Sequence, residues 1–212
     1  MDFRSYARNI STPAKKTSIL ADITASGDVT LSMDTLDDYL NALGRLFVVQ
    51  DLEAWCPAIR SKTVLRSTMK RCFVDPSIAV AALGLTPSLL QEQLKTFGFL
   101  FEQMCIRDLK AYSVEQGGRL SFYRDRYGLE ADGVLHLDDG RYALLEFKLG
   151  SREIEEGAAH LQELRSLLRQ KKLTETQVPL REPDLLLVIT GGKMAYSRKD
   201  GVKVIPLACL RP

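Results

Sequence analysis

The stretch LEADGVLHLDDGRYALLEFKL, residues 129–149, sets the architecture of the second half of the chain. It contains two runs rich in apolar residues, separated by Asp138, Asp139 and Gly140. An Asp-Gly pair between two such runs is typical of a tight β-hairpin, because glycine readily adopts the positive φ that the turn requires. The stretch therefore predicts two antiparallel strands, over 129–137 and 142–149.

Further elements on both sides of this hairpin complete an α/β pattern. Apolar residues that recur at three to four positions predict helices, and alternating or continuous short apolar runs predict strands. In chain order we expect a helix over 99–115, a strand over 120–126, the two hairpin strands, a helix over 152–172, a strand over 185–190 and a last pair of strands over 194–197 and 202–205.

The first part of the chain has a different pattern, in which helices come first. Ser32 is expected to cap the most regular of them. The expected elements are helices over 3–9, 14–25 and 33–47, strands over 47–49 and 71–74, and short helices over 76–83 and 86–94. Three helices followed by two strands are the layout of a winged helix-turn-helix. We therefore expect a winged-helix domain over 1–84 and an α/β domain over 85–212.

Residues 60–71, RSKTVLRSTMKR, connect the two expected strands and contain no acidic residue. They are the best candidate for phosphate contact with DNA, through Arg60, Lys62, Arg66, Lys70 and Arg71. A solvated loop paired with nearby acids is an equally good interpretation. Asp34, Asp37 and Asp38 on the third helix would repel phosphate, which favours docking of this domain to a protein instead.

The composition indicates an ordinary folded protein of one or two domains. The chain has 212 residues, 45% hydrophobic and 26% charged, and a formal net charge of +2. That net charge does not by itself indicate a nucleic-acid partner. The four cysteines form no C-x-x-C pair and no signal peptide precedes them, so we expect reduced thiols and a cytoplasmic location. No apolar run approaches the roughly 20 residues that cross a bilayer, so we expect no membrane partner.

Three charged residues of the expected strands are candidates for catalysis. Side chains alternate across a strand, so Glu146 and Lys148 lie on one face of a strand whose other face is wholly apolar. Such charges are costly in a buried strand unless they pair or bind a metal. Asp132 lies on the neighbouring strand, and the hairpin brings the two strands together. We therefore expect Asp132, Glu146 and Lys148 to converge.

Two carboxylates and a lysine at one sheet edge are the groups that metal-dependent hydrolysis of a phosphodiester requires. Carboxylate oxygens hold Mg²⁺ or Mn²⁺, and water and phosphate oxygens complete an octahedron. The metal polarises the phosphoryl oxygen and lowers the pKa of the attacking water, while the lysine orients that water or neutralises developing charge. Glu102, in an otherwise apolar turn of the preceding helix, is a candidate for a third acidic ligand.

A purely structural interpretation of these residues stays open. Glu-x-Lys is short enough to occur by chance, and Glu146 with Lys148 would also suit an internal ion pair at the end of a strand. The catalytic interpretation is favoured by the position of the motif, after a hairpin and beside a strand that carries Asp132.

The second half of the chain resembles the PD-(D/E)XK nuclease-like, or restriction-endonuclease-like, core of helix, three-stranded meander, helix and further strands. In that resemblance Asp132 matches the metal-binding aspartate, Glu146 the second acidic ligand and Lys148 the lysine. Glu102 matches an acidic residue often found on the first helix. The sequence departs from the pattern at Glu130-Ala131-Asp132-Gly133, which lacks the proline of the signature.

Nearly the whole chain resembles the C-terminal region of a large prokaryotic group of AAA-type ATPases, usually described as a domain of unknown function. The stretches that carry the resemblance are SYARNISTPAKKTSILADI, DTLDDYLNALGRLFVVQDLEAWCP, RSKTVLR, KRCFVDPSIAVAALGLTP, TFGFLFEQMCIRDLKAY, EADGVLHLDDGRYALLEFKLGS and VITGG. The resemblance implies an upstream ATPase module, so we expect this chain to be a fragment. No G-x-x-x-x-G-K-[ST] motif occurs, so we expect no ATP site in it.

Two functions of different classes follow from these observations. The first is a Mg²⁺- or Mn²⁺-dependent nuclease acting on DNA, with Asp132 and Glu146 as ligands and Lys148 as the catalytic cation. The second is a non-catalytic module that couples DNA or a protein partner to an ATPase. The intact acidic residues and lysine favour the first, and the small net charge and acidic third helix favour the second.

Overall fold

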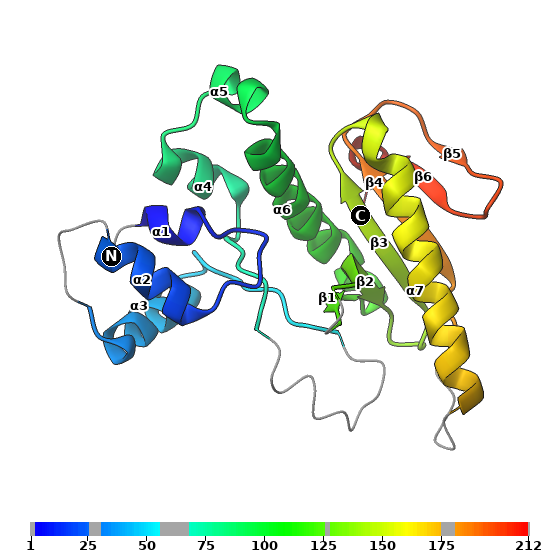
Figure 1. Ribbon diagram of the computed structural model, residues 1–212, viewed down its shortest axis with the longest axis horizontal. Coiled ribbons are helices and arrows are strands. Elements are labelled where there is room, and N and C mark those ends of the chain that lie inside the picture. The colour runs from blue at the N-terminus through cyan, green and yellow to red at the C-terminus, as the bar shows by residue number, and fades with distance from the viewer. Residues whose placement is uncertain (1–2, 26–30, 56–67, 126–127, 175–180, 212) are drawn as a thin grey trace. The chain divides into compact units, whose positions relative to one another are not determined.

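The computed structural model describes residues 3–25, 31–55, 68–125, 128–174 and 181–211, and they form two compact units (Figure 1). The first unit contains the described residues up to Glu53 together with Thr68–Arg107. The second contains Ala54, Trp55 and the described residues from Asp108 onward. The division falls later than the expected boundary after residue 84, because Leu90, Phe99 and Leu100 pack against the core of the first unit.

The helices of the first unit lie where apolar spacing predicted them, although the last of them begins at Leu94, five residues before the expected start at Phe99. They are α1 (Phe3–Ala7), α2 (Lys16–Ala25), α3 (Met33–Arg45), α4 (Pro76–Leu83), α5 (Pro87–Glu92) and α6 (Leu94–Ser113), whose last residues belong to the second unit. Ser32 caps α3 as predicted, since the Thr35 N–H donates to Ser32 Oγ at 3.1 Å. Thr86 caps α5 in the same way, by accepting from the Leu89 N–H at 3.3 Å.

Helix α3 ends two residues earlier than expected, and Phe47 is not in a strand. Phe47 has a φ of 55°, a left-handed conformation that costs a residue with a side chain about 1–2 kcal/mol. The turn is closed by hydrogen bonds from Phe47 N to Gly44 O at 3.1 Å and from Val48 N to Leu43 O at 2.9 Å. This pair of bonds is a Schellman motif, which commonly ends a helix with glycine in the place that Phe47 occupies here.

The two extended segments that follow α3 pair with one another in the antiparallel sense. Val49 bridges Phe73 and Leu52 bridges Lys70, and Leu52 and Lys70 exchange two backbone hydrogen bonds of 2.9 Å. The pairing consists of isolated bridges, so these segments form a short ribbon and no extended strand. The order of three helices and a paired ribbon is as expected. The connection over 56–67, with most of the basic run, lies outside the described residues.

The second unit is a mixed α/β structure built on a six-stranded sheet. Its strands are β1 (Arg119–Arg124), β2 (Glu130–His136), β3 (Tyr142–Lys148), β4 (Leu185–Thr190), β5 (Tyr196–Ser197) and β6 (Lys203–Pro206), and its long helix is α7 (Ile154–Thr174). Short 3-10 turns lie at Val114–Gln116, Ser151–Glu153 and Leu207–Cys209. The strand order is β1-β2-β3-β4-β6-β5.

The sheet combines the predicted meander with parallel strands. Strands β1, β2 and β3 pair antiparallel, β4 pairs parallel to β3, β6 pairs parallel to β4, and β5 is an antiparallel edge strand on β6. The β2–β3 turn contains Gly140, whose φ of 84° is the positive value that the Asp-Gly pair predicted. The hairpin prediction is therefore confirmed.

Helix α7 connects β3 to β4 and lies along one face of the sheet (Figure 1). Its buried residues recur at three and four positions and pack against inward-facing residues of the strands. The residues in this core include Ala158, Leu161, Leu164 and Leu168 of α7 and Leu144, Val188 and Val204 of the sheet. Burial of these side chains stabilises the unit by about 1.5–3 kcal/mol for each large one. This core holds the carboxyl ends of β3 and β4 in fixed register.

No helix among the described residues is long and apolar enough to cross a membrane.

Candidate active site

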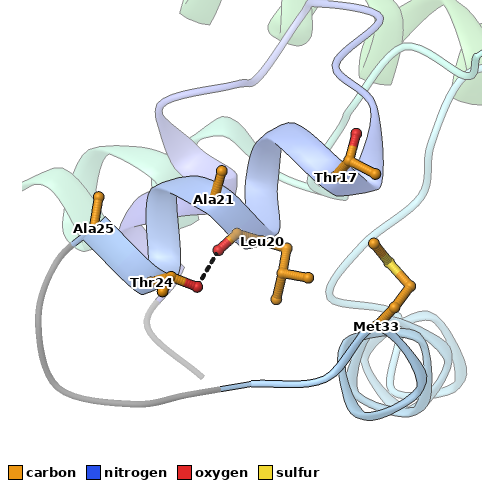
Figure 2. Close-up of a pocket in the computed structure, with 6 residues that line it drawn as sticks. All are labelled: Thr17, Leu20, Ala21, Thr24, Ala25 and Met33. Carbon is orange, nitrogen blue, oxygen red and sulfur yellow. Dashed lines mark hydrogen bonds between the residues drawn. The ribbon is translucent and has the colours of Figure 1, made fainter.

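A depression in the first unit lacks the chemistry of an active site. It has a volume of about 530 Å³ and lies between α2 and the start of α3 (Figure 2). Its lining consists of Thr17, Leu20, Ala21, Thr24, Ala25 and Met33. The Thr24 hydroxyl donates to the Leu20 carbonyl at 2.9 Å within α2. Because no lining residue is ionisable, catalytic groups have to be sought elsewhere.

Asp132, Glu146 and Lys148 do converge, at one end of the sheet in the second unit. The Lys148 ammonium lies 2.7 Å from Glu146 Oε2 and 3.8 Å from Asp132 Oδ2. Both carboxylates therefore contact one cation. The hairpin supplies Asp132 from β2 and the other two residues from β3, so the geometry rests on the predicted strand pairing.

The register of β2 and β3 explains why Asp132 reaches this point. The ladder runs from His136↔Tyr142 to Gly133↔Leu145 and ends there. One residue further on, Asp132 Oδ2 accepts a hydrogen bond from the Phe147 N–H at 2.9 Å. The side chain thus replaces a backbone carbonyl, and this bond holds the carboxylate beside Glu146.

Gly133 permits the close approach of the two strands at the site. A Cβ at Gly133 would lie 3.0 Å from Leu145 Cδ1 and 3.1 Å from Phe147 Cζ. Contacts this short force the neighbouring side chains to move. The glycine that follows Asp132 therefore has a packing reason for its position.

The three side chains are largely shielded from water but are not sealed. Glu146 keeps 3% of its side-chain exposure, Asp132 15% and Lys148 19%. Burial alone would lower the pKa of the Lys148 ammonium. The charges of Asp132 and Glu146, with the hydrogen bond to Glu146, outweigh that effect and raise the pKa above its ordinary value of 10.5. Lys148 is therefore protonated at neutral pH.

Helix α7 brings two further residues to the site that sequence reasoning missed. A Cβ at Gly157 would lie 3.1 Å from Lys148 Cε and 3.3 Å from Glu146 Cβ, so any larger residue would push these side chains by a few tenths of an ångström. The charge of Glu156 also raises the pKa of Lys148. An isolated glycine inside a helical pattern was the available indication, since such a glycine often has a packing role.

The donor set fits a hard divalent cation that keeps water ligands. Among the residues that the structure describes, no group of three or more His, Cys, Asp or Glu side chains is arranged to hold a metal ion. Asp132 and Glu146 supply two carboxylates, and Mg²⁺ is commonly bound by one or two carboxylates with water and substrate phosphates. The two residues therefore suit Mg²⁺ or Mn²⁺, and they do not form a closed protein cage.

Glu102 makes its described contact in the first unit. Its Oε1 accepts a hydrogen bond from Lys70 Nζ at 2.6 Å, and the Lys70 side chain is 1% exposed. Arg71 is also buried, where its guanidinium pairs with Asp51 and donates from Nε to the Ala14 carbonyl at 2.9 Å. Lys70 and Arg71 were expected to contact phosphate, but here their cations bind groups of their own unit.

The remaining basic residues of the predicted phosphate-binding run cannot be placed in the same way. Arg60, Lys62 and Arg66 lie outside the described residues. The predicted nuclease triad is therefore brought together, while the predicted DNA-binding run is represented only by its two buried members.

Two family models match the chain. The first, described as Domain of unknown function (DUF4143), covers residues 97–210, and domains of this kind are typically found C-terminal to AAA ATPases. The second, described as Domain of unknown function (DUF8612), covers residues 2–89. No curated protein and no solved structure gave a significant match. The first match contains all three converging residues.

Proposed function

We propose that this chain, which belongs to the DUF4143 family, carries a Mg²⁺- or Mn²⁺-dependent nuclease site made of Asp132, Glu146 and Lys148. One observation carries the proposal: the protonated Lys148 ammonium lies against the carboxylates of Asp132 and Glu146. The cluster is partly open to solvent and lies at the carboxyl end of β3, which pairs parallel to β4. Ligands of α/β sheets commonly bind outside the carboxyl ends of such strands.

Asp132 and Glu146 would hold the divalent ion, which when bound polarises the phosphoryl oxygen and lowers the pKa of a water molecule. The hydrogen bond from the Phe147 N–H orients the Asp132 carboxylate for this task. Glu146 is held by the buried strand on which it lies. Both ligands therefore come from rigid elements, which favours a preorganised site.

Lys148 would act as a cation and not as a base. Because its pKa is raised, it carries no free electron pair at neutral pH with which to accept a proton. Its ammonium can instead neutralise the charge that develops on the phosphoryl oxygens, or donate a proton to the leaving oxygen. The two carboxylates beside this ammonium supply the oxygen ligands that a divalent cation would use.

The first unit, which we propose to be a winged helix, would serve to bring DNA or the ATPase to this site. The order of three helices and an antiparallel ribbon supports this proposal. The family's usual place after an AAA ATPase supports an ATPase partner.

Cleavage of DNA by the purified chain tests the nuclease proposal. With millimolar Mn²⁺ or Mg²⁺, we expect cleavage of plasmid and single-stranded DNA that stops in EDTA. The variant Lys148→Ala should reduce the rate about 10²–10³-fold, as loss of one transition-state donor does elsewhere. The surface variant Lys203→Ala is the matched control and should cleave normally. Retention of full activity by Lys148→Ala would contradict the proposal.

A non-catalytic coupling module is the second candidate, and one observation favours it. Lys148 already pairs with both carboxylates, which is also the arrangement of a stable internal ion cluster. In that case the chain would bind its ATPase or DNA but leave every nucleic acid intact in Mn²⁺, both alone and together with the ATPase.

A further inference from the structure

The chain leaves β4 directly beside the proposed catalytic lysine. Lys148 and Thr190 are the last residues of β3 and β4, and they are paired in register. Beyond Thr190 the chain turns through Gly191 and Gly192, where the Gly192 N–H donates to Thr190 Oγ1 at 3.3 Å. The segment that follows therefore starts one strand away from Lys148.

The same segment returns to the sheet as the edge strand β5. Tyr196 pairs with Val204, Val204 with Val188 and Val188 with Glu146. Residues paired across a sheet share its level and its face, so Tyr196 lies level with Glu146 on the face that α7 covers. Three strand spacings of about 4.8 Å place the two Cα atoms about 14 Å apart. Strand β5 is the last in the strand order, so it forms the outer edge of the sheet next to β6 (Figure 1).

Large apolar side chains are exposed along this segment. Met194 keeps 76% of its exposure and Tyr196 keeps 46%. Every residue from Gly191 to Ser197 is exposed. An aromatic ring open to solvent beside cations is the usual platform on which single-stranded nucleic acids stack a base.

The charges around the segment suit a polyanion. Within the described part of the chain, neither Lys193 nor Lys199 forms an ion pair. Arg198 pairs with both Glu155 and Asp200, so one cation offsets part of the charge of these two carboxylates. This pairing lowers the negative charge that a phosphate approaching the segment would meet.

We infer that the surface from Lys193 to Tyr196 binds single-stranded DNA and leads it to the site at Lys148. Lys193 would contact a phosphate and Tyr196 would stack on a base. A single strand is the occupant, because the base faces of a duplex are covered by their neighbours. This inference rests on the proposed function, since it names the substrate class of that site.

Binding of a fluorescein-labelled dT oligonucleotide to the full chain in EDTA tests the inference without any cleavage. Tyr196→Ala should raise Kd about tenfold, and Tyr196→Phe should keep the wild-type Kd within about twofold, because phenylalanine retains the stacking ring. Lys193→Ala should reduce the slope of log K against log salt by about 0.7, the value for one phosphate contact on a single strand.

Lys203→Ala is the matched control for charge. Lys203 pairs with Ser197 in register, so it lies on the opposite face from Tyr196, and its Nζ donates to Ser197 Oγ at 2.9 Å. The salt slope should therefore stay unchanged in this variant. A duplex of the same length should bind more weakly than the single strand. Equal effects of Lys193→Ala and Lys203→Ala, or wild-type binding by Tyr196→Ala, would overturn the inference.

The two proposals fail in different ways. Binding that responds to Tyr196→Ala and Lys193→Ala as expected supports the binding surface, even if Mn²⁺ produces no cleavage and the nuclease proposal fails. Metal-dependent cleavage by a chain whose Tyr196→Ala variant binds the oligonucleotide normally would overturn the binding surface and leave the nuclease proposal standing.

Discussion

Two buried clusters of opposite charge, one in each unit, differ in ways that separate a structural role from a functional one. In the first unit Lys70 binds Glu102 at 2.6 Å, and the lysine side chain is 1% exposed. In the second unit Lys148 binds Glu146 at 2.7 Å, but Asp132 adds a second carboxylate and the lysine side chain is 19% exposed. The Lys70 ammonium is shielded from solvent and its partner Glu102 keeps 11% of its side-chain exposure, while Lys148 is more open and faces two carboxylates.

This difference shows what each cluster is suited to do. A buried pair such as Lys70 and Glu102 helps to fix one packing arrangement, because removing the carboxylate takes away a partner of the buried ammonium. A partly open cluster in which two carboxylates face each other across one ammonium offers the oxygen ligands that a divalent cation prefers. A lysine whose pKa is shifted by specific charge partners is a candidate for a functional site.

The largest expected effect comes from the same isosteric change in each cluster. Glu102→Gln should lower the free energy of unfolding by about 3–5 kcal/mol, because it leaves the Lys70 ammonium buried without its carboxylate. Glu146→Gln should lower it by less than about 1 kcal/mol, since Asp132 still faces Lys148 and the repulsion between carboxylates is relieved. Urea unfolding of both variants measures the difference. Equal losses of stability would remove the distinction between the clusters.

A smaller effect is expected where α7 approaches the open cluster. Gly157→Ala would place a Cβ 3.1 Å from Lys148 Cε, and we expect DNA cleavage to fall about tenfold as the ammonium moves by a few tenths of an ångström. Gly150→Ala is the control, because no heavy atom lies within 4 Å of its added Cβ. Cleavage rates measured on both folded variants should separate them. Equal rates would show that the position of Lys148 does not limit cleavage.

The smallest effect is expected at an exposed ion pair of the first unit. Asp75 caps α4 by accepting from the Ser77 N–H at 2.8 Å, and it pairs with Arg107 at 2.6 Å. Asp75→Ala should lower the free energy of unfolding at pH 7 by about 1 kcal/mol, most of it from the lost cap. Solvent screens the ion pair, whose side chains are more than a third exposed.

The stability that Asp75 provides should also depend on pH. Hydrogen bonds from Ser77, together with Arg107, hold the pKa of this carboxyl below its ordinary value of 3.8. The contribution is therefore fully present above the unfolded pKa and is lost as the pH falls through the lower folded pKa. Unfolding curves of the wild type and Asp75→Ala should converge below about pH 4. A constant difference down to pH 2 would contradict this assignment.

Much of the second unit could be predicted because its local rules agree with one another. The Asp139-Gly140 turn, the apolar runs on either side and the alternation around Glu146 all specify the same hairpin, so the convergence of Asp132 with Lys148 followed from pairing alone. The hydrogen bond that the Phe147 N–H of β3 donates to the Asp132 carboxylate could not be predicted from the sequence. It depends on the ladder ending one residue earlier, at Gly133, which only the packed structure decides.

The first unit shows where sequence reasoning is weaker. Lys70 and Arg71 belong to a run of basic residues, and a basic run normally lies in solvent. Both are nevertheless buried, because Glu102 and Asp51 come from segments distant in sequence to neutralise them. Likewise Phe47 fits a strand by composition, but hydrogen bonds from Phe47 N to Gly44 O and from Val48 N to Leu43 O close a left-handed turn there. Long-range pairing and chain reversal of this kind leave no local pattern.

Binding of Mn²⁺ to the full chain, followed by electron paramagnetic resonance of the free ion, tests whether the open cluster is a metal site. We predict saturable binding that is lost in Asp132→Asn and in Glu146→Gln and is retained in Asp139→Asn, a surface change on the same hairpin. Binding that persists unchanged in Asp132→Asn and Glu146→Gln, or no binding by the wild type at millimolar Mn²⁺, would contradict the assignment and leave these residues a structural ion cluster.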